Sequence, residues 1–305
     1  MIDVAVETDS LTKHFCGKTA LSQFSLRIPN GGTHAIVGSN GAGKSTLFRL
    51  LLGILTPSSG RCHLLGQDSR HLSPETRGKV GYVNEEHTLP NWMTARQVTE
   101  FQKHFYPQWD DETYRLVIEN FDVKSNQLVK SLSRGERAGL NLAIALAQGP
   151  ALLILDEPTL GIDVVAKKAF LESLMLTCSA RETTLIYCSH QMEEIERLAD
   201  TLIVMERGKL KSHSSPDDFC ERVTAWQAGF PEGVRLDDLP GLLTSREIEG
   251  CWHITALDQG EGFRRCLEQR GGEAIRQAPV NLEGAVNAFL GKNHHAPQQP
   301  RRRAS

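Results

Sequence analysis

Residues 38–45 read Gly38-Ser39-Asn40-Gly41-Ala42-Gly43-Lys44-Ser45 and fit the pattern G-x-x-x-x-G-K-[ST] in full. Glycines here let backbone N–H groups turn inward around phosphate oxygens, which a Cβ would obstruct. Lys44 can reach the β- and γ-phosphates of a nucleotide, and the Ser45 hydroxyl suits Mg²⁺. An apolar run, His34 to Val37, precedes the loop and a helical stretch, Ser45 to Leu52, follows it. This context predicts a phosphate-binding loop between a strand and a helix, whose N-terminal dipole favours anions.

The chain around this loop has the pattern of an α/β fold. Two later runs, Leu152 to Leu155 and Thr184 to Cys188, are short and apolar throughout, as in strands buried on both faces of a parallel sheet. A helix over Val165 to Cys178 lies between them and completes a βαβ unit. Alternation over Phe24 to Ile28 indicates a strand with one exposed face. Two more helices are expected over Trp109 to Gln127 and Glu136 to Gln148.

The composition changes after Ser212. The polar stretch Ser212 to Asp218 is expected to be a linker, and residues 219–291 a small accessory domain. The alternation there predicts a small α+β appendix, with strands over Trp252 to Leu257 and Glu273 to Val280 and helices over Gly262 to Gln269 and Asn281 to Leu290. The end of the chain, 292–305, is rich in Pro, Gln and Arg and is expected to be disordered.

Composition excludes several classes of protein. The 305 residues carry 34 basic and 37 acidic side chains, so the net charge of -3 gives no footprint for a polyanion and no nucleic acid is expected as a partner. No run approaches the roughly 18 apolar residues of a membrane span, so any membrane role must come through a partner. The seven cysteines form no Cys-x-x-Cys pair, which favours free thiols in a reducing compartment.

Two further stretches carry chemistry. Leu132-Ser133-Arg134-Gly135-Glu136 stands at the start of a predicted helix, where Ser133 and Gly135 would present a hydroxyl and an amide to a phosphate. Taken alone, it is equally well explained as a helix N-cap. About twenty residues on, Leu152 to Asp156 is an apolar strand ending in the acidic pair Asp156-Glu157. Asp156 can hold Mg²⁺ through water and Glu157 can polarise an attacking water, whereas the alternative is a solvated acidic turn.

These motifs, in this order and at these distances, resemble the ABC ATPase family. Residues 132–136 resemble its LSGGQ signature, with Arg134 and Glu136 as departures, and 152–158 its Walker B motif. Gly161-Ile162-Asp163 resembles its D-loop. His190, 33 residues after Glu157, resembles the switch histidine, whose imidazole can hydrogen-bond the γ-phosphate. A solvated histidine at a strand end is the alternative.

Two more matches are less regular. Phe15 matches the aromatic residue that stacks on adenine, although a core phenylalanine would also fit a strand. Glu85 stands where the Q-loop of the family usually has Gln, and its carboxylate could supply an oxygen to Mg²⁺ or its waters. The following segment, Leu89 to Thr94, is apolar enough to dock a membrane subunit or to form a local cluster. This segment and Phe105 to Asp110 look similar to exporters of the ABC-2 type.

The resemblance covers residues 3–215 and implies a fold and a function. The fold is a P-loop NTPase core with a parallel sheet, an antiparallel β subdomain and a helical subdomain. The implied function is that of an ATP-hydrolysing motor, and the likeness to ABC-2 exporters implies that it drives an exporter, with ATP and Mg²⁺ as cofactors. The implied ATP-binding residues are Phe15, the loop residues Gly38, Ser39, Asn40, Gly41, Ala42, Gly43, Lys44, Ser45 and Thr46, and Ser133, Gly135 and Asp163; the Mg²⁺ ligands are Ser45, Asp156 and Glu85; the catalytic residues are Glu157 and His190.

One P-loop and one signature also imply partners. The family packs two copies head to tail, so that ATP lies between the P-loop of one and the signature of the other. We therefore expect a second ATPase subunit, identical or a sibling, and integral membrane permease subunits. The protein would be cytoplasmic and peripheral on the inner face of the cell membrane. The rival function is a soluble ABC ATPase acting on ribosomes, DNA or protein complexes, but the two fused ATPase units or long coiled coils of such proteins are missing here.

Overall fold

The computed structural model describes residues 4–260 and 262–291, so the tail expected to be disordered, 292–305, lies outside the described residues. The chain divides into two compact units at the boundary between His213 and Ser214. No helix of the described residues is long and apolar enough to cross a membrane.

A six-stranded sheet forms the centre of the first unit. Its strand order is β10-β9-β3-β8-β7-β6, and β9, β3, β8, β7 and β6 pair in parallel. The strands are β3 Thr33–Val37, β6 Val80–Val83, β7 Leu152–Asp156, β8 Thr184–Cys188, β9 Thr201–Glu206 and β10 Lys209–Ser214. All residues of β7 and β8 are buried, as their continuous apolar runs predict.

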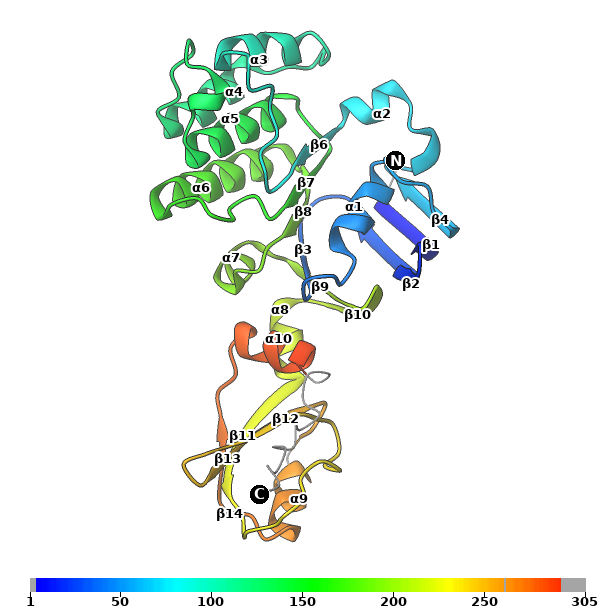
Figure 1. Ribbon diagram of the computed structural model, residues 1–305, viewed down its shortest axis with the longest axis vertical. Coiled ribbons are helices and arrows are strands. Elements are labelled where there is room, and N and C mark those ends of the chain that lie inside the picture. Colours follow the sequence, from blue (N-terminus) through cyan, green and yellow to red (C-terminus); the bar gives the residue numbers. More distant parts are fainter. Residues whose placement is uncertain (1–3, 261, 292–305) are drawn as a thin grey trace, which may run out of the picture. The chain divides into compact units, whose positions relative to one another are not determined.

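Each face of this sheet contributes to its own hydrophobic core. On β8, Ile186 packs with Phe24 and Leu47 in one cluster, while Tyr187 packs with Phe170 in another. Because neighbouring side chains of a strand point to opposite faces, β8 holds the two cores apart. Figure 1 shows the antiparallel strands on one side of the sheet and a group of helices on the other.

The first core is closed by a second, antiparallel sheet of order β2-β1-β4-β5 and by helix α1. The elements are β1 Val4–Phe15, β2 Lys18–Pro29, α1 Lys44–Leu51, β4 Ser59–Leu64 and β5 Gln67–Asp68, with the short helices η1 Ser69–His71 and α2 Pro74–Gly78 after them. Along β2, Phe24, Leu26 and Ile28 are buried and the residues between them are exposed. This alternation is the one that the sequence predicts for a strand with one exposed face.

Helices cover the second core. They are α3 Ala95–Lys103, α4 Asp111–Ile118, α5 Arg134–Ala147, α6 Val164–Arg181 and α7 Met192–Leu198, with single turns η2 Glu119–Phe121 and η3 Val129–Ser131. The helix expected to reach Gln127 ends earlier: α4 stops at Ile118, and the turn η2 that follows ends at Phe121, because Asp122 adopts a left-handed conformation with φ 37°. The chain then continues as a loop to η3.

The second unit is a four-stranded antiparallel sheet of order β12-β13-β11-β14 with helices, so the α+β appendix is confirmed. Its elements are α8 Pro216–Glu221, β11 Val223–Gly229, β12 Leu242–Ile248, β13 Cys251–Leu257, α9 Gly262–Gln269, β14 Glu273–Ala278 and α10 Leu282–Gly291. Trp226, Ile254, Phe263 and Leu267 form its core. Two of its strands, β11 and β12, are absent from the sequence-based expectation.

The linker expected over Ser212 to Asp218 does contain the boundary between the two units, but the segment is not an irregular loop. Strand β10 continues to Ser214, and α8 begins at Pro216. The Ser215 side chain accepts a hydrogen bond from the backbone N–H of Asp218 at 3.0 Å, so Ser215 is the N-cap and Pro216 fills the first helical position. A serine followed by proline and two acids is a helix start, and its polarity alone suggested a linker.

Candidate nucleotide-binding site

The phosphate-binding loop connects β3 to α1 and lies close to the backbone around it. A Cβ at Gly38 would lie 2.4 Å from the carbonyl oxygen of Met205, and one at Gly43 would lie 2.6 Å from that of Ala20. Gly43 also has φ 105°, a left-handed value that favours glycine. The loop can take this path only with glycine at both positions.

Lys44 is buried at the first turn of α1. Its Nζ donates to the carbonyl oxygens of Gly38 at 2.6 Å and Ser39 at 3.5 Å. An ammonium group has three donors and strongly prefers a partner of opposite charge when it is buried. The loop thus holds the ammonium group of Lys44 against its own carbonyl oxygens.

Two carboxylates face this cation from the end of β7. Asp156 and Glu157 are both buried, and the Ser45 hydroxyl donates a hydrogen bond to Asp156. Burial raises the pKa of Asp156, and the Ser45 hydrogen bond and the Lys44 charge oppose that rise. Two of the three side chains predicted to hold Mg²⁺, Ser45 and Asp156, therefore interact with each other.

Glu157 occupies an unusual backbone conformation, with φ 52° in the left-handed region. Non-glycine residues adopt it rarely, and such strain gathers at functional sites. Its Oε1 lies 3.1 Å from Nε2 of His190, and its Oε2 accepts the backbone N–H of His190 at 3.2 Å. Burial raises the pKa of Glu157, and the positive charge of His190, when present, lowers it. A buried carboxylate with a raised pKa is suited to take up a proton.

A hollow of about 350 Å³ unites most of the predicted residues. Phe15, at the end of β1, lines it with a ring that is 46% exposed, and Lys13 Nζ lies 5.3 Å from the ring centroid. The lining also includes Asn40, Gly41, Ala42, Gly43, Lys44, Ser45, Thr46, Glu85, Asp156, Glu157 and His190. Lys18 and Ala20 complete it, and sequence reasoning missed both because β2 carries no motif.

Glu85 lines the hollow beside a residue from another predicted motif. Its Oε1 lies 4.0 Å from Nη2 of Arg134, and both side chains are about half exposed. The two departures from the family pattern, an acid for Gln and an arginine in the signature, are thus neighbours of opposite charge. An exposed pair at this distance adds little stability.

His87 ties the same loop to the turn after β7. Its ring is buried, and Nε2 donates to the carbonyl oxygen of Pro158 at 2.8 Å, with Nδ1 lacking a hydrogen-bond partner. Burial, and to a smaller extent the charges of Arg134 and Arg137, lower the pKa of His87 to about 4, against the opposing effect of the hydrogen bond to Pro158. The ring is therefore neutral at physiological pH.

Five predicted ATP-binding residues do not line the hollow: Gly38 and Ser39 at the start of the loop, and Ser133, Gly135 and Asp163, which form a second group. Ser133 caps α5: its hydroxyl accepts the N–H of Glu136 at 3.1 Å, and Glu136 accepts the N–H of Ser133 at 2.6 Å. Asp163 caps α6 by accepting the N–H groups of Val165 and Ala166. A Cβ on Gly135 would lie 2.7 Å from that of Ala166, so the two helix starts pack together.

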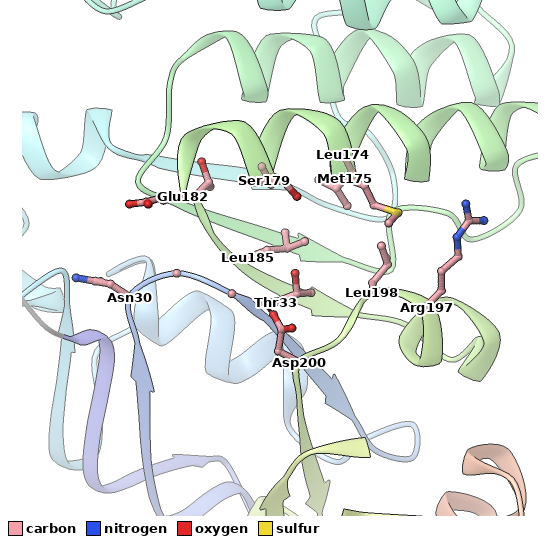
Figure 2. Close-up of a pocket in the computed structure, with 14 residues that line it drawn as sticks. Asn30, Thr33, Leu174, Met175, Ser179, Glu182, Leu185, Arg197, Leu198 and Asp200 are labelled. Atoms are coloured by element: carbon pink, nitrogen blue, oxygen red, sulfur yellow. Dashed lines mark hydrogen bonds between the residues drawn. The ribbon is translucent and has the colours of Figure 1, made fainter. Parts of the chain in front are cut away.

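A larger hollow of about 520 Å³ lies at the opposite edge of the sheet. Figure 2 shows Thr33, Leu185 and Asp200 at the beginnings of β3, β8 and β9, with Met175 of α6 above them. The Asp200 carboxylate accepts the N–H of Thr33 at 2.7 Å. In open α/β sheets, ligands bind at the carboxyl ends of the strands, so the smaller hollow is the nucleotide site.

Metal binding by protein side chains alone finds no support. Across residues 4–260 and 262–291, no three His, Cys, Asp or Glu side chains gather in a way that would hold a metal ion. Ser45 and Asp156 nevertheless provide hard oxygen donors. Mg²⁺ bound with substrate phosphates uses one or two protein ligands of this kind, so the donor set fits Mg²⁺.

Comparison with known proteins gives a consistent result. The family model described as ABC transporter matches residues 21–160. The Nod factor export ATP-binding protein I of Rhizobium johnstonii is 33% identical, over 95% of this chain and 96% of that protein. The ABC transporter ATP-binding protein YtrB of Bacillus subtilis is 25% identical, over 94% of this chain and 98% of its own length. Both alignments are long enough to include most of the second unit.

Solved structures agree with the fold. The dimeric ATP-binding cassette MJ0796, in a post-hydrolysis state with ADP and Pi, superimposes with a TM-score of 0.61 at 21% identity. The match covers 69% of this chain and 98% of that cassette. It confirms the P-loop α/β architecture.

Proposed function

Because the chain belongs to the ATP-binding subunits of ABC transporters, a family of ATPases, we propose that it drives an exporter as the motor half of a dimer. The observation that carries this proposal is the separation of its predicted residues into two groups on one chain. The hollow holds a buried lysine and three acids, two of them buried, but no signature residue, and the signature group holds no phosphate-binding lysine. Each group is half of a site.

Within the hollow, the phosphates of ATP bind to the loop of residues 38–46, with Lys44 against the β- and γ-phosphates. The adenine ring stacks on the exposed face of Phe15, where Lys13 occupies the other side. Ser45 and Asp156 would hold Mg²⁺, and the carboxylate of Glu85, which lines the same hollow, would supply a further oxygen donor. Bound there, Mg²⁺ would neutralise charge on the phosphate oxygens.

Glu157 takes the proton of the attacking water. Its carboxylate is buried and held from two sides by the ring and the backbone of His190, so its position is fixed. The His190 side chain is 44% exposed, which leaves it free to turn its Nε2 from Glu157 toward the γ-phosphate. Loss of that phosphate would remove a contact, and the histidine would report it to the rest of the chain.

The second subunit completes each site. The side chains of Val164 and Val165, next to Asp163, are 82% and 80% exposed. Two β-branched apolar side chains so exposed at the start of α6 favour contact with another protein surface. With a second copy head to tail, the helix starts of α5 and α6 would face the phosphates bound in the partner's hollow.

The membrane partner would dock on the helical part of the unit. Leu89 and Met93 pack against a cluster that includes Val98 and Leu132, whereas Trp92 is 76% exposed. Two side chains of the segment belong to a local cluster, and the indole of Trp92 is exposed and available for docking. We propose that this face binds a cytoplasmic helix of a permease. Export follows from the name of the Rhizobium relative.

The decisive experiment uses Glu157→Gln in the full chain. We expect ATP to bind with near wild-type affinity, turnover to fall by about 100-fold or more, and a stable dimer to appear in light scattering. ADP is the control and should leave a monomer. Adding Lys44→Ala in the same background should weaken ATP binding about 100-fold and abolish the dimer, since a charged partner of the phosphates is lost.

Two outcomes would contradict the proposal. One is turnover at the wild-type rate in Glu157→Gln, which would remove Glu157 as the base. The other is a variant that stays monomeric with ATP bound, which would remove the shared site.

A further inference from the structure

A third carboxylate lies behind the site, on helix α7. Glu194 is only 2% exposed and does not line the hollow. Its Oε2 accepts hydrogen bonds from the hydroxyls of Tyr187 at 2.5 Å and Ser189 at 2.7 Å. The hydroxyl of Thr159 lies 2.9 Å from Oε1 and 3.1 Å from Oε2. Three hydroxyl donors thus converge on one buried acceptor.

A cation balances this buried charge. Lys167 of α6 places its Nζ 2.9 Å from Oε1 of Glu194, and it also donates to the side-chain oxygen of Gln191. A buried carboxylate without such partners would be strongly disfavoured. The group is complete: an ionised carboxylate only accepts, and every neighbour named here is a donor.

The donors belong to the two segments that the proposed mechanism uses. Thr159 stands two residues after Glu157 in the turn that leads to Asp163, and Ser189 directly precedes His190. The Ser189 hydroxyl also accepts the backbone N–H of Gln191 at 3.0 Å. Both chain neighbours of His190 are therefore tied to the Glu194 group, one through its hydroxyl and the other through Lys167.

His190 thus lies between two carboxylates with different tasks. Glu157 holds its backbone N–H and its ring from the side of the hollow. Glu194 holds the residues on either side of it from the interior. A movement of the histidine loop on loss of the γ-phosphate would pull on Ser189, and through the shared carboxylate on Thr159.

We propose that Glu194 is a positioning residue for ATP hydrolysis, which joins the switch-histidine loop to the turn before Asp163 through one carboxylate. This inference rests on the proposed function, because it takes His190 and Asp163 in their proposed roles. Glu194 touches neither nucleotide nor water in the hollow. It acts through Ser189 and Thr159, so that the phosphate contact of one site and the dimer-facing turn move together.

The test is a double-mutant cycle on Thr159→Val and Ser189→Ala. Their side chains share Glu194, so removing either hydroxyl should disturb the same group. We expect each variant to lower kcat about 10-fold, and the double variant to lose far less than the 100-fold product. ATP affinity should change less than about 3-fold, because the loop of Lys44 binds the nucleotide.

The same cycle is then repeated in the Glu194→Gln background, which lacks the carboxylate that Thr159 and Ser189 share. The glutamine side chain has nearly the same shape, but its amide nitrogen is a donor and cannot accept a hydrogen bond from a hydroxyl. The two substitutions should then act independently on whatever rate remains. Glu194→Asp keeps the charge and should recover part of kcat. Independent effects in the wild-type background, or equal kcat in Glu194→Gln and wild type, would overturn the inference.

Thr183→Val is the matched control. Its hydroxyl is equally buried but donates to the carbonyl oxygen of Pro150 at 3.0 Å, just before β8 and outside the Glu194 group. It should lower the melting temperature without a change in kcat. If the glutamine variant fails to fold, the cycle in the wild-type background still decides the question. If the wild-type chain itself neither forms the ATP dimer nor turns over, the proposed function has failed instead.

Discussion

The hollow and the signature group use their polar side chains in opposite ways. In the hollow, Lys44, Asp156 and Glu157 are buried together, and the pKa values of both acids are raised by burial. In the signature group, the side chains of Ser133 and Asp163 accept hydrogen bonds from backbone N–H groups of their own helices. The hollow therefore contains buried charged side chains that a bound ligand can stabilise. The signature group offers helix starts that become useful only when another chain supplies the phosphate.

The difference comes from where each group lies in the fold. The hollow collects residues from the carboxyl ends of β3, β7 and β8, which parallel pairing brings to one edge. The signature group sits at the beginnings of α5 and α6, where capping is a local requirement of the helix. The hollow therefore contains a residue with a strained backbone, Glu157 at φ 52°, whereas the capping residues Ser133 and Asp163 have ordinary φ values of -59° and -72°.

Mixing two inactive variants tests most directly whether the hollow of one chain works with the signature group of another. Ser133→Asp keeps an N-cap but places a negative charge opposite the partner's phosphates, so it should bind ATP normally and lose turnover about 100-fold. Lys44→Ala should lose binding. In an equal mixture, the mixed dimer joins an intact hollow to an intact signature group, and about a quarter of the wild-type rate should return by random pairing.

ATPase rate against mixing ratio measures this effect. As a control, Ser133→Asn keeps the cap without the charge and should stay closer to wild type. No recovery at any ratio would show that the two groups do not meet across identical chains, and a sibling subunit would then have to be sought.

His87 sharpens the comparison through pH, because its ring fastens the Glu85 loop to the Pro158 turn while Arg134 and Arg137 of the signature helix face it. Its pKa falls from 6.5 in the unfolded chain to about 4 in the folded one. The His87 ring therefore binds a proton more weakly in the folded protein than in the unfolded chain. The unfolding free energy present above pH 6.5 should decrease as pH falls toward 4. The loss amounts to about 3 kcal/mol.

Urea unfolding at pH 7.5, 6, 5 and 4 measures it. His87→Gln carries no titrating group and retains a donor for Pro158, so its unfolding free energy should fall less over the same range. Parallel pH profiles for the two proteins would contradict the assignment. The absolute stability of the variant at pH 7.5 does not enter the comparison.

The smallest expected effect is on stability, where neutralising two different carboxylates should change the unfolding free energy in opposite directions. Glu157 has a raised pKa, so its ionised form costs stability at neutral pH, and Glu157→Gln should stabilise the fold by on the order of 1 kcal/mol. The gain should shrink as pH falls. Hydrogen bonds from Ala166 and Val165 lower the pKa of Asp163, so Asp163→Asn should lose stability at neutral pH, slightly because Asn also caps well. Thermal unfolding at pH 7.5 and 5 compares the two.

Much of this site could be predicted because its chemistry is local. The loop of Gly43 and Lys44 needs glycines and a lysine at fixed spacing, and the strand before Asp156 needs only a continuous apolar run. Both requirements are written along the chain. The expectation of an irregular linker failed for the opposite reason. Ser215 is polar because it caps a helix, but a polar residue considered without its neighbours suggests a loop.

The sequence by itself determined the α/β core, the phosphate-binding loop and the ATPase family, since each depends on residues a few positions apart, and Glu157 as the base stays a prediction. Only the tertiary structure decided which of them share a pocket. It placed Glu85 beside Arg134, separated Ser133 from Lys44, and brought Thr159, Tyr187 and Ser189 to Glu194. These contacts join elements up to tens of residues apart, and no periodicity records them, because burial and shared hydrogen bonds arise only when strands and helices pack.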